Sequence, residues 1–305
     1  MPVVWNLYYF ISMNHESSIK FAFFGSSRMS VVVLEELKTA GLTPIFVVTT
    51  PDKPQGRKLV LTPNVVKTWA ISNRVHVFDF GKFDKVAIDS LSKETTGGSV
   101  SVFIVASYGK ILPSSVINIP PRKTLNIHPS LLPKYRGPSP LQQAILDDTK
   151  RTGVTIMRID EQMDHGPIVA QKEIIMNEWP VYEDFEEMMA KEGEHQLASI
   201  LPEWIAGKLP EMEQDHSKAT TTRKFIKEDG LIDFTGDQYK NFRKIQAFHE
   251  WPQSYFFIDH ASRKIRIKIT SASFTNGKLE IIKVIPEGSS EISFSDFQKG
   301  YKFSL

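Results

Sequence analysis

Two polar residues separated by a single position give this sequence its clearest chemical signal. Asn126 and His128 lie within LNIHPSLLPKYRGPSP, the stretch from Leu125 to Pro140. In an extended strand alternate side chains point to the same face, so we expect this amide and imidazole to lie side by side. An amide donates hydrogen bonds without ionising, and an imidazole can donate or transfer a proton near neutral pH. The pair would suit stabilisation of negative charge that develops on a carbonyl oxygen.

A carboxylate further along the chain could complete this site. Asp164 lies in EQMDHGPIV, in an expected loop between two strands, where Gly166 would allow a close approach of the backbone. A carboxylate beside an imidazole holds the ring in one tautomer. Two other interpretations stay open from the residues alone: a hydrogen-bonded core histidine with a turn asparagine, and a metal site of His128, Asp164 and His165. The metal site lacks a characteristic ligand spacing, so we expect no bound metal.

The composition excludes several other kinds of catalytic site. The chain has no cysteine, which rules out disulfides, thiolate zinc sites and a cysteine nucleophile, and which fits a reducing compartment. The Gly-x-Ser-x-Gly motif of esterases is absent from the sequence. The stretch FFGSSRMS has one glycine where a dinucleotide fingerprint has three, so we expect no nucleotide cofactor.

The elements that would position the site alternate between strands and helices. The expected strands are Ile19–Phe24, Pro44–Thr49, Val100–Ala106, Thr124–His128, Val154–Arg158 and Ile168–Ile175. The expected helices are Met29–Lys38, Pro63–Ala70 with Thr62 as its cap, Pro138–Leu146 and Tyr182–Ile205. This alternation predicts an α/β fold with a doubly wound, Rossmann-like sheet, whose active site lies beyond the carboxyl ends of the strands.

The sequence changes in character toward its C-terminus. Residues 207–229 are polar, and we interpret them as a linker. Beyond Gly230, one helix near Asp237–Ala247 is followed by the β-rich runs Tyr255–Ile258, Lys264–Ser273 and Lys278–Val284, which predict a small barrel-like β domain. The expected organisation is an extension at residues 1–17, a catalytic domain at 18–206, a linker at 207–229 and a C-terminal domain at 230–305.

The charges are distributed unevenly along the chain. The formal net charge is only +2, but residues 147–215 carry 6 basic and 17 acidic side chains, whereas residues 216–305 carry 15 basic and 10 acidic ones. Residues 51–69 carry Lys53, Arg57, Lys58 and Lys67 against Asp52 alone. Two basic regions of this kind would suit a polyanionic partner, although ordinary solvated surfaces explain them equally well.

The N-terminus gives no sign of export or membrane insertion. No apolar run approaches the roughly 20 residues that a membrane helix needs, so we expect no membrane association. Val3–Ile11 is apolar, but the first basic residue is Lys20, which argues against a secretory signal and a mitochondrial presequence. Met13 is an alternative start, and we interpret residues 1–17 as a dispensable extension of a cytoplasmic protein.

Two stretches resemble a known family of enzymes. NIHPSLLPKYRG and GVTIMRIDEQMDHGPIV are similar to motifs of the formyltransferases that use 10-formyltetrahydrofolate. The resemblance implies that Asn126, His128 and Asp164 are the catalytic residues. It also implies folate contacts from SLLP and from the upstream segment VASYGKILPSSVI. The implied folate-binding residues are Tyr108, Gly109, Ile111, Leu112, Ser130, Leu131, Leu132 and Pro133.

One loop distinguishes between members of this family, which act on glycinamide ribonucleotide, amino sugars or methionyl-tRNA. PDKPQGRKLVLTPNVVK, residues 51–67, resembles the basic loop of the members that act on methionyl-tRNA, with Arg57 at the position of its key arginine. Asn64-Val65-Val66-Lys67 stands where Ser-Pro-Val-Lys is common, and an extra glycine and lysine are missing, so we expect weaker tRNA contact from this loop. The implied tRNA-binding residues are Lys53, Arg57, Lys58, Lys67, Arg223 and Lys224.

The C-terminal region agrees with that branch of the family. DGLIDF, IQAFHEWPQSYF and PEGSSEISFSDFQKGY resemble parts of its small OB-like tRNA-binding domain. The resemblance implies a monomer that transfers a formyl group from 10-formyltetrahydrofolate to the methionine α-amine of initiator Met-tRNA, for translation initiation. One alternative is an amino-sugar or nucleotide-sugar N-formyltransferase with the same three catalytic residues. Another is a tRNA-binding or folate-binding protein without catalysis, which the three intact residues disfavour.

Overall fold

The computed structural model describes residues 19–56, 59–260 and 263–303. The extension expected at residues 1–17 and the tRNA contacts expected of Arg57 and Lys58 lie outside the described residues. The chain divides into two units, and each takes residues from several parts of the sequence. Unit 1 comprises residues up to Gly137, Gly153–Ile174 and Glu187–Thr221, and unit 2 comprises Pro138–Thr152, Ile175–Glu186 and the residues from Thr222 onward.

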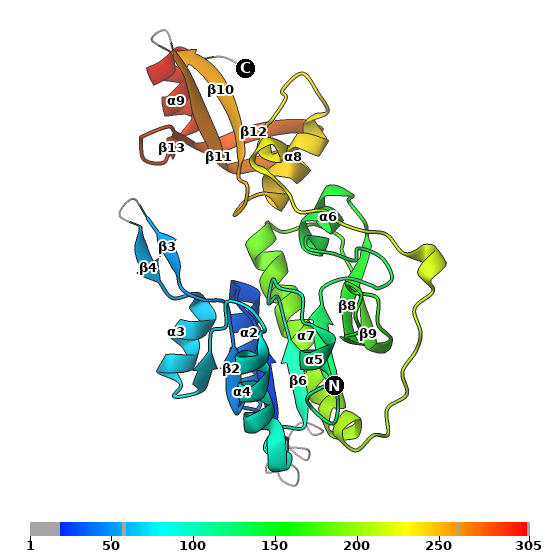
Figure 1. The fold of residues 1–305 in the computed structure, drawn as a ribbon. Coiled ribbons are helices and arrows are strands. Elements are labelled where there is room, and N and C mark those ends of the chain that lie inside the picture. Colours follow the sequence, from blue (N-terminus) through cyan, green and yellow to red (C-terminus); the bar gives the residue numbers. More distant parts are fainter. Residues whose placement is uncertain (1–18, 57–58, 261–262, 304–305) are drawn as a thin grey trace. The chain divides into compact units, whose positions relative to one another are not determined.

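Unit 1 is built on a seven-stranded sheet in the order β5-β2-β1-β6-β7-β8-β9 (Figure 1). The strands are β1 (Phe21–Phe24), β2 (Phe46–Val48), β5 (His76–Phe78), β6 (Val102–Val105), β7 (Thr124–His128), β8 (Arg151–Arg158) and β9 (Ile168–Ile175). The first five in sheet order run parallel, and β8 is antiparallel to β7. The expected mixed α/β fold with a largely parallel sheet is thus confirmed. The chain winds outward from β1 in both directions, which places a switch point between β1 and β6.

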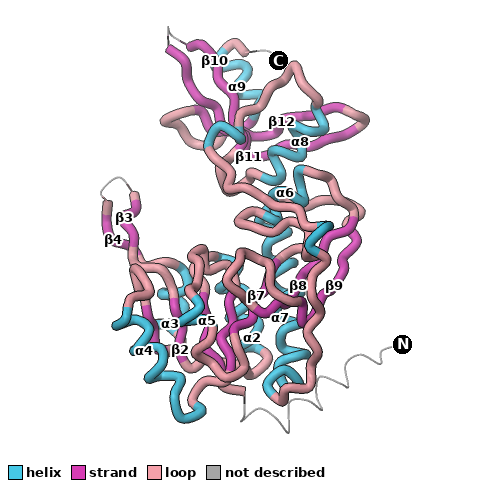
Figure 2. The backbone as a smooth tube through the Cα atoms, turned by 45° about the vertical axis from the view of Figure 1, so that its right-hand side comes forward, coloured by secondary structure: helices cyan, strands magenta, loops and turns pink. Residues whose placement is uncertain are grey.

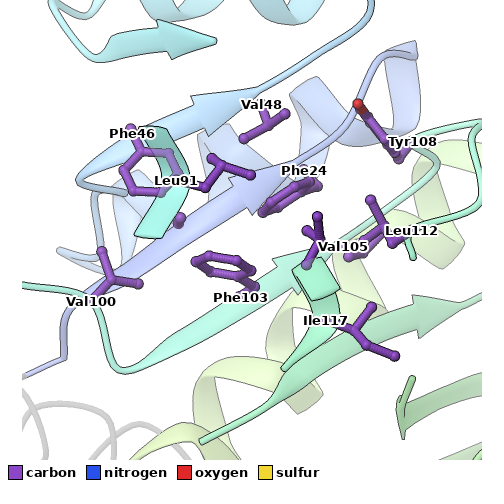
Figure 3. Close-up of a cluster of buried hydrophobic side chains, with 12 residues drawn as sticks. Phe24, Phe46, Val48, Leu91, Val100, Phe103, Val105, Tyr108, Leu112 and Ile117 are labelled. Atoms are coloured by element: carbon purple, nitrogen blue, oxygen red, sulfur yellow. The ribbon is translucent and has the colours of Figure 1, made fainter. Parts of the chain in front are cut away.

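One face of the sheet packs into an aromatic-rich apolar layer (Figure 3). Phe24 of β1 lies 5.0 Å from Phe103 of β6, measured between ring centroids. Leu91 of helix α4 (Lys85–Thr95) and Ile117 of helix α5 (Ser114–Ile117) belong to the same buried cluster. These helices therefore cover this face of the sheet.

The opposite face of the sheet carries the long helix α7 (Tyr182–Ile205). A Cβ on Gly193 would come within 2.4 Å of Ile127 Cγ2 and 3.3 Å of Val154 Cγ1. The glycine therefore allows the helix backbone to approach β7 and β8 closely. Because side chains alternate along a strand, Ile127 faces α7 while Asn126 and His128 point to the other face.

The turn after β1 is shaped by Gly25 and a capping box. A Cβ on Gly25 would lie 2.6 Å from the Ser30 side chain and 2.7 Å from the Phe23 ring, so only glycine fits. Ser27 caps helix α2 (Arg28–Thr39), and the Ser30 hydroxyl donates to the Ala106 carbonyl at 2.7 Å. Gly25 therefore permits a tight turn that joins β1 to the end of β6.

Several elements differ from the sequence expectation. Helix α3 (Val65–Ser72) is capped by Asn64 rather than Thr62, because the Asn64 side chain accepts from the amides of Val66 and Lys67. A hairpin of β3 (Lys53–Gln55) and β4 (Val60–Thr62) precedes it and was not expected. None of the helices in the described part of the chain combines the length and apolar character needed to cross a membrane.

Unit 2 contains a four-stranded antiparallel sheet in the order β10-β11-β12-β13, coloured as strands in Figure 2. Its elements are α6 (Pro140–Leu146), α8 (Gln238–Ala247), β10 (Ser254–His260), β11 (Arg263–Thr275), β12 (Lys278–Pro286), β13 (Ile292–Ser293) and α9 (Phe294–Tyr301). Ile267, Val284 and Phe297 are fully buried in its apolar core. Arg243 of α8 donates to the Ile145 carbonyl of α6 at 3.0 Å, which ties α6 to this unit.

Candidate functional site

Asn126 and His128 occupy the carboxyl end of β7. Asn126 lies opposite Val105 of β6 and Met157 of β8, and it shares the face of the sheet with Val105. Asn126 is half-buried, whereas His128 is buried. The strand thus presents an amide and an imidazole on one face where the parallel strands end, which is the usual position of active sites in such sheets.

The His128 ring lies between two hydrogen-bond acceptors. Its Nε2 is 2.9 Å from the Tyr135 carbonyl oxygen, which can only accept, so Nε2 donates to it. Its Nδ1 lies 3.6 Å from Asp164 Oδ1, longer than a hydrogen bond but within ion-pair range. The Nδ1 edge of the ring therefore faces a carboxylate oxygen.

Asp164 reaches His128 from the loop between β8 and β9. Its second oxygen, Oδ2, accepts a hydrogen bond of 2.7 Å from the Gly137 amide. Its backbone has φ of +50°, an uncommon conformation for a residue other than glycine. A Cβ on Gly166 would lie 2.0 Å from the Arg158 carbonyl oxygen, so Gly166 permits the close approach that the sequence suggested. No cluster of three or more metal-binding side chains occurs in the part of the chain that the structure describes.

The loop after β7 is held rigid by hydrogen bonds from within itself and from neighbouring strands. The Ser130 hydroxyl donates to the Lys134 carbonyl at 2.6 Å, and the Thr155 hydroxyl donates to the Ser130 carbonyl at 2.6 Å. Gln171 of β9 donates to the Leu132 carbonyl at 2.9 Å. Leu132 is buried against Met157 and Ile168, while Leu131 and Pro133 are partly exposed. Among the residues expected to bind folate here, Leu131 and Pro133 therefore present the more accessible surface.

The second segment expected to bind folate is partly buried in the core and partly exposed. Tyr108 and Leu112 are buried in the apolar cluster of unit 1, as their positions in Figure 3 show. Between them, Gly109 has φ of +79° with open space around its α-carbon, and Ile111 is 74% exposed. The structure thus offers Gly109 and Ile111 as the accessible residues of this segment.

Some of the basic residues expected to bind tRNA form ion pairs with acidic side chains, and others are exposed to solvent. Lys67 lies between Asp52 and Asp79, at 2.8 Å and 2.7 Å, and these hydrogen bonds raise the pKa of its ammonium group. Arg223 pairs with Asp229 through both terminal nitrogens and lies 5.0 Å from the Phe225 ring centroid. Lys53 on the hairpin and Lys224 are exposed. Lys67 and Arg223 therefore have structural partners, whereas Lys53 and Lys224 project toward solvent.

The sequence matches a defined family. A family model described as formyl transferase matches residues 19–204, more than half of the chain. The chain belongs to this family. The methionyl-tRNA formyltransferase of Chloroflexus aurantiacus is 38% identical to this formyltransferase over 260 residues, which are 85% of this chain and 83% of the relative.

Solved structures share the fold of this formyltransferase. The methionyl-tRNA formyltransferase of Clostridium thermocellum has a TM-score of 0.59 at 14% identity, and the match covers 88% of this chain and 98% of that one. An N-formyltransferase of Helicobacter canadensis, in complex with folinic acid and dTDP-3-aminofucose, has a TM-score of 0.59 at 20% identity, covering 85% and 88% of the two chains. At these identities the likeness concerns the fold.

Arg136 and Gln214 lie beside the site of this formyltransferase, and the sequence did not predict their contact. Arg136 was interpreted as a scaffold or folate-side residue, and Gln214 lies in the polar segment that was interpreted as a linker. In the structure the Gln214 side chain is buried and accepts from Arg136 at 2.6 Å. A glutamine within a polar segment carries no local sign of burial, so only its distant partners reveal it.

Proposed function

We propose that this formyltransferase transfers the formyl group of 10-formyltetrahydrofolate to the α-amino group of methionine on initiator Met-tRNA. The observation that carries the proposal is the approach of Asp164 to His128 beside Asn126, at the carboxyl end of the parallel strands. The identity of 38% to a methionyl-tRNA formyltransferase over most of both chains supports the choice of acceptor.

The three polar residues would divide the chemistry of formyl transfer between them. A bond forms between the amine nitrogen and the formyl carbon, and the bond from that carbon to N10 of the folate breaks. The amine loses a proton, and N10 of the departing tetrahydrofolate gains one, so the step is balanced. Asn126 and His128 donate hydrogen bonds to the formyl oxygen while it carries negative charge. Asp164 orients the imidazole and assists removal of the proton from the amine. Because His128 Nε2 donates to the Tyr135 carbonyl in this structure, donation to substrate requires that hydrogen bond to be exchanged.

The two loops beside the site combine apolar side chains with backbone polar groups, which suits the pteridine ring of the formyl donor. The loop at 130–133 is held in place by its hydrogen bonds and offers backbone groups together with the side chains of Leu131 and Pro133. Ile111 adds an exposed apolar side chain on the neighbouring loop. A flat ring with a polar edge needs this combination of apolar contact and fixed polar groups.

The remaining parts of the proposal concern tRNA binding and organisation. We infer that Lys53, Arg57, Lys58, Lys67, Arg223 and Lys224 contact tRNA phosphates. We also propose a catalytic domain at 18–206, a linker at 207–229 and an OB-like tRNA-binding domain at 230–305. The antiparallel sheet of unit 2 supports the β-rich character of the last of these. We propose that the protein acts as a monomer in the cytoplasm.

One assay tests the acceptor directly. Labelled formyl groups would be transferred from 10-formyltetrahydrofolate to Met-tRNA, with free and nucleotide-linked amino sugars as competing acceptors. We expect product on Met-tRNA and no inhibition by the sugars. Product on the sugars alone would establish the amino-sugar alternative, and the absence of any product would support a binding protein without catalysis.

A further inference from the structure

The Gln214 side chain uses both ends of its amide inside unit 1. Its Oε1 accepts from Arg136 Nε at 3.2 Å and from Arg136 Nη2 at 2.6 Å. Its Nε2 donates to the carbonyl of Asp164 at 3.0 Å and to that of Gly166 at 2.7 Å. Gln214 is only 5% exposed, so these four contacts replace water around a buried polar group.

The two segments that Gln214 joins both touch the catalytic residues. Gly137, which follows Arg136, donates its amide to Asp164 Oδ2, and the Tyr135 carbonyl accepts from His128 Nε2. On the other side, Gln214 binds the backbone of Asp164 itself. The amide of one glutamine therefore connects the loop that contacts His128 with the loop that carries Asp164.

Further contacts hold the segment around Gln214 in this position. The amide of Arg136 donates to the Thr220 carbonyl at 2.9 Å, and the amide of Tyr135 donates to the Thr220 hydroxyl at 2.9 Å. His216 Nδ1 lies 2.8 Å from Arg136 Nη2, and the His216 ring stacks on His165 with 4.1 Å between ring centroids. Residues 214–220, which the sequence suggested to be linker, are thus docked onto both loops.

We propose that Gln214, together with Arg136, is a positioning residue that sets the separation of Asp164 and His128. Asp164 has a positive φ, and such a conformation persists where surrounding contacts hold it. Donation by Gln214 to the Asp164 carbonyl is one of these contacts, and the bond from Gly137 is another. The role in catalysis rests on the proposed function, because Asp164 matters only if it acts with His128.

Two substitutions at Gln214 separate its donor role from its acceptor role. Gln214→Met removes all four hydrogen bonds at a similar side-chain length. Gln214→Glu keeps an acceptor for Arg136 but loses the donor to the Asp164 and Gly166 carbonyls. We expect both variants to lower kcat by roughly 10- to 100-fold, because small displacements of a catalytic group have effects of this size. We expect KM for Met-tRNA and for the formyl donor to stay within about threefold, because the Gln214 side chain is buried and its amide is taken up by protein groups.

The matched control lies on the same segment. Glu211 forms a bidentate ion pair with Arg158 at 2.7 Å and 2.8 Å, which anchors this stretch of chain to β8. Glu211→Gln weakens this anchor without removing any contact of Gln214. We expect it to change thermal stability slightly and to leave kcat near that of the wild type.

Two measurements that do not need turnover complete the experiment. Hydrogen exchange of the Gly137 amide should accelerate in both Gln214 variants but not in Glu211→Gln, because that amide is protected by Asp164. The imidazole nitrogen resonances of His128 should shift in the same two variants. Unchanged exchange and unchanged His128 resonances in the folded Gln214 variants would overturn the proposal, as would a wild-type kcat.

The outcomes also separate this inference from the proposed function. If the wild type transfers no formyl group to Met-tRNA, the function is wrong, while the two spectroscopic measurements still decide whether Gln214 positions Asp164. If Gln214→Met does not fold, Gln214→Glu and Arg136→Lys carry the comparison. Arg136→Lys retains one donor to Gln214 Oε1, so it should keep most of the kcat, whereas Gln214→Glu should not. A folded Gln214→Glu variant with the same kcat as Glu211→Gln would count against the proposal.

Discussion

Asp164 and His128 interact at a distance that allows charge stabilisation without a short hydrogen bond. The carboxylate is held on its far side by the Gly137 amide, at 2.7 Å, so its orientation does not depend on the imidazole. His128 is likewise held on its far side by the Tyr135 carbonyl. Each member of the pair is therefore positioned by backbone groups, which favours preorganisation of the site before substrate arrives.

The substitution Asp164→Asn tests the charge of this residue. Asparagine keeps the size of the side chain and an oxygen that can accept from Gly137. It removes the negative charge that faces His128 at 3.6 Å. We expect kcat to fall by about 10²–10³-fold with a nearly unchanged melting temperature. Single-turnover formyl transfer gives the measurement, and a rate within a factor of about 3 of the wild type would remove Asp164 from the catalytic set.

Tyr108 provides a second test at the residue scale, because it was expected to bind folate and lies in the core. Its hydroxyl is buried without a hydrogen-bond partner in the described part of the chain, and burial raises its pKa to about 12. We expect Tyr108→Phe to keep stability or increase it by up to about 1 kcal/mol, because an unsatisfied buried hydroxyl is removed. KM for the formyl donor should not change.

The matching control is Tyr108→Ala. Loss of the ring from the apolar cluster should lower the free energy of unfolding by roughly 3–5 kcal/mol, as for other buried aromatic residues. Chemical denaturation measures both variants. A raised KM for the formyl donor in Tyr108→Phe would show instead that the hydroxyl contacts the folate.

At the scale of elements, the base of the β3–β4 hairpin is tied to the sheet through the cap of helix α3. Asn64 Oδ1 accepts from the amides of Val66 and Lys67 and from the Thr49 hydroxyl, each at 3.0 Å. Its Nδ2 donates to the Thr50 carbonyl at 2.7 Å. Asn64 thus joins the helix start to the segment that leads from β2 into the hairpin.

The variant Asn64→Ala should therefore lower the free energy of unfolding by more than the loss of an ordinary helix cap does. We expect it to lower the free energy of unfolding by about 2 kcal/mol, because both capping and tethering contacts are lost. Asp84→Ala is the matched control, since Asp84 caps α4 through the Ala87 amide and ties no second segment. This control should cost about 1 kcal/mol in urea denaturation. Equal losses in the two variants would show that the contacts to Thr49 and Thr50 contribute nothing.

For the whole molecule, a buried carboxyl group couples stability to pH. Glu194 of α7 is 8% exposed, and its Oε1 has no hydrogen-bond partner in the part of the chain that the structure describes. Burial, and to a lesser extent the charge of Glu36, raises the pKa of Glu194 to about 7 from its ordinary value of 4.5. The folded state therefore holds this proton more tightly than the unfolded chain. Its contribution to stability is fully present below about pH 4.5 and is lost as the pH rises through about 7.

The variant Glu194→Gln should reveal this coupling. We expect little change in the free energy of unfolding at pH 5 and an increase on the order of 2 kcal/mol at pH 8, where the wild type must bury a charge. Glu203→Gln, an exposed position on the same helix, is the control and should have a small effect at both pH values. A stability difference between Glu194→Gln and the wild type that does not vary with pH would contradict the prediction.

Binding of tRNA should depend on charges spread over much of the chain. We expect the logarithm of the association constant to fall linearly with the logarithm of salt concentration, because bound phosphates release counterions. Lys53→Ala and Lys224→Ala should each reduce the magnitude of this logarithmic slope by about 1. Lys93→Ala, which replaces an exposed lysine of α4, should leave the slope unchanged. Filter binding over a range of salt concentrations measures this. A flat salt response would argue against a polyanionic substrate.

The sequence by itself determined the elements whose patterns are local. The bounds of β7, β9 and α7 agree with the expected Thr124–His128, Ile168–Ile175 and Tyr182–Ile205, because apolar periodicity and flanking residues define them. The alternation of side chains along β7 placed Asn126 and His128 on one face. The family followed from the motifs around them. The short β3–β4 hairpin was missed, because three-residue strands leave too little pattern to detect.

Only the tertiary structure decided which distant groups meet at the site. Gln214 lies 50 residues beyond Asp164 and 78 beyond Arg136, yet its amide binds both. Its neighbours in the sequence are exposed and polar, so nothing local distinguishes it from the rest of a linker. Likewise, only the structure shows that Lys67 pairs with Asp52 and Asp79 and that Arg223 pairs with Asp229. Local pattern specifies elements because it reflects backbone geometry, whereas partners of polar side chains depend on where the fold brings remote segments together.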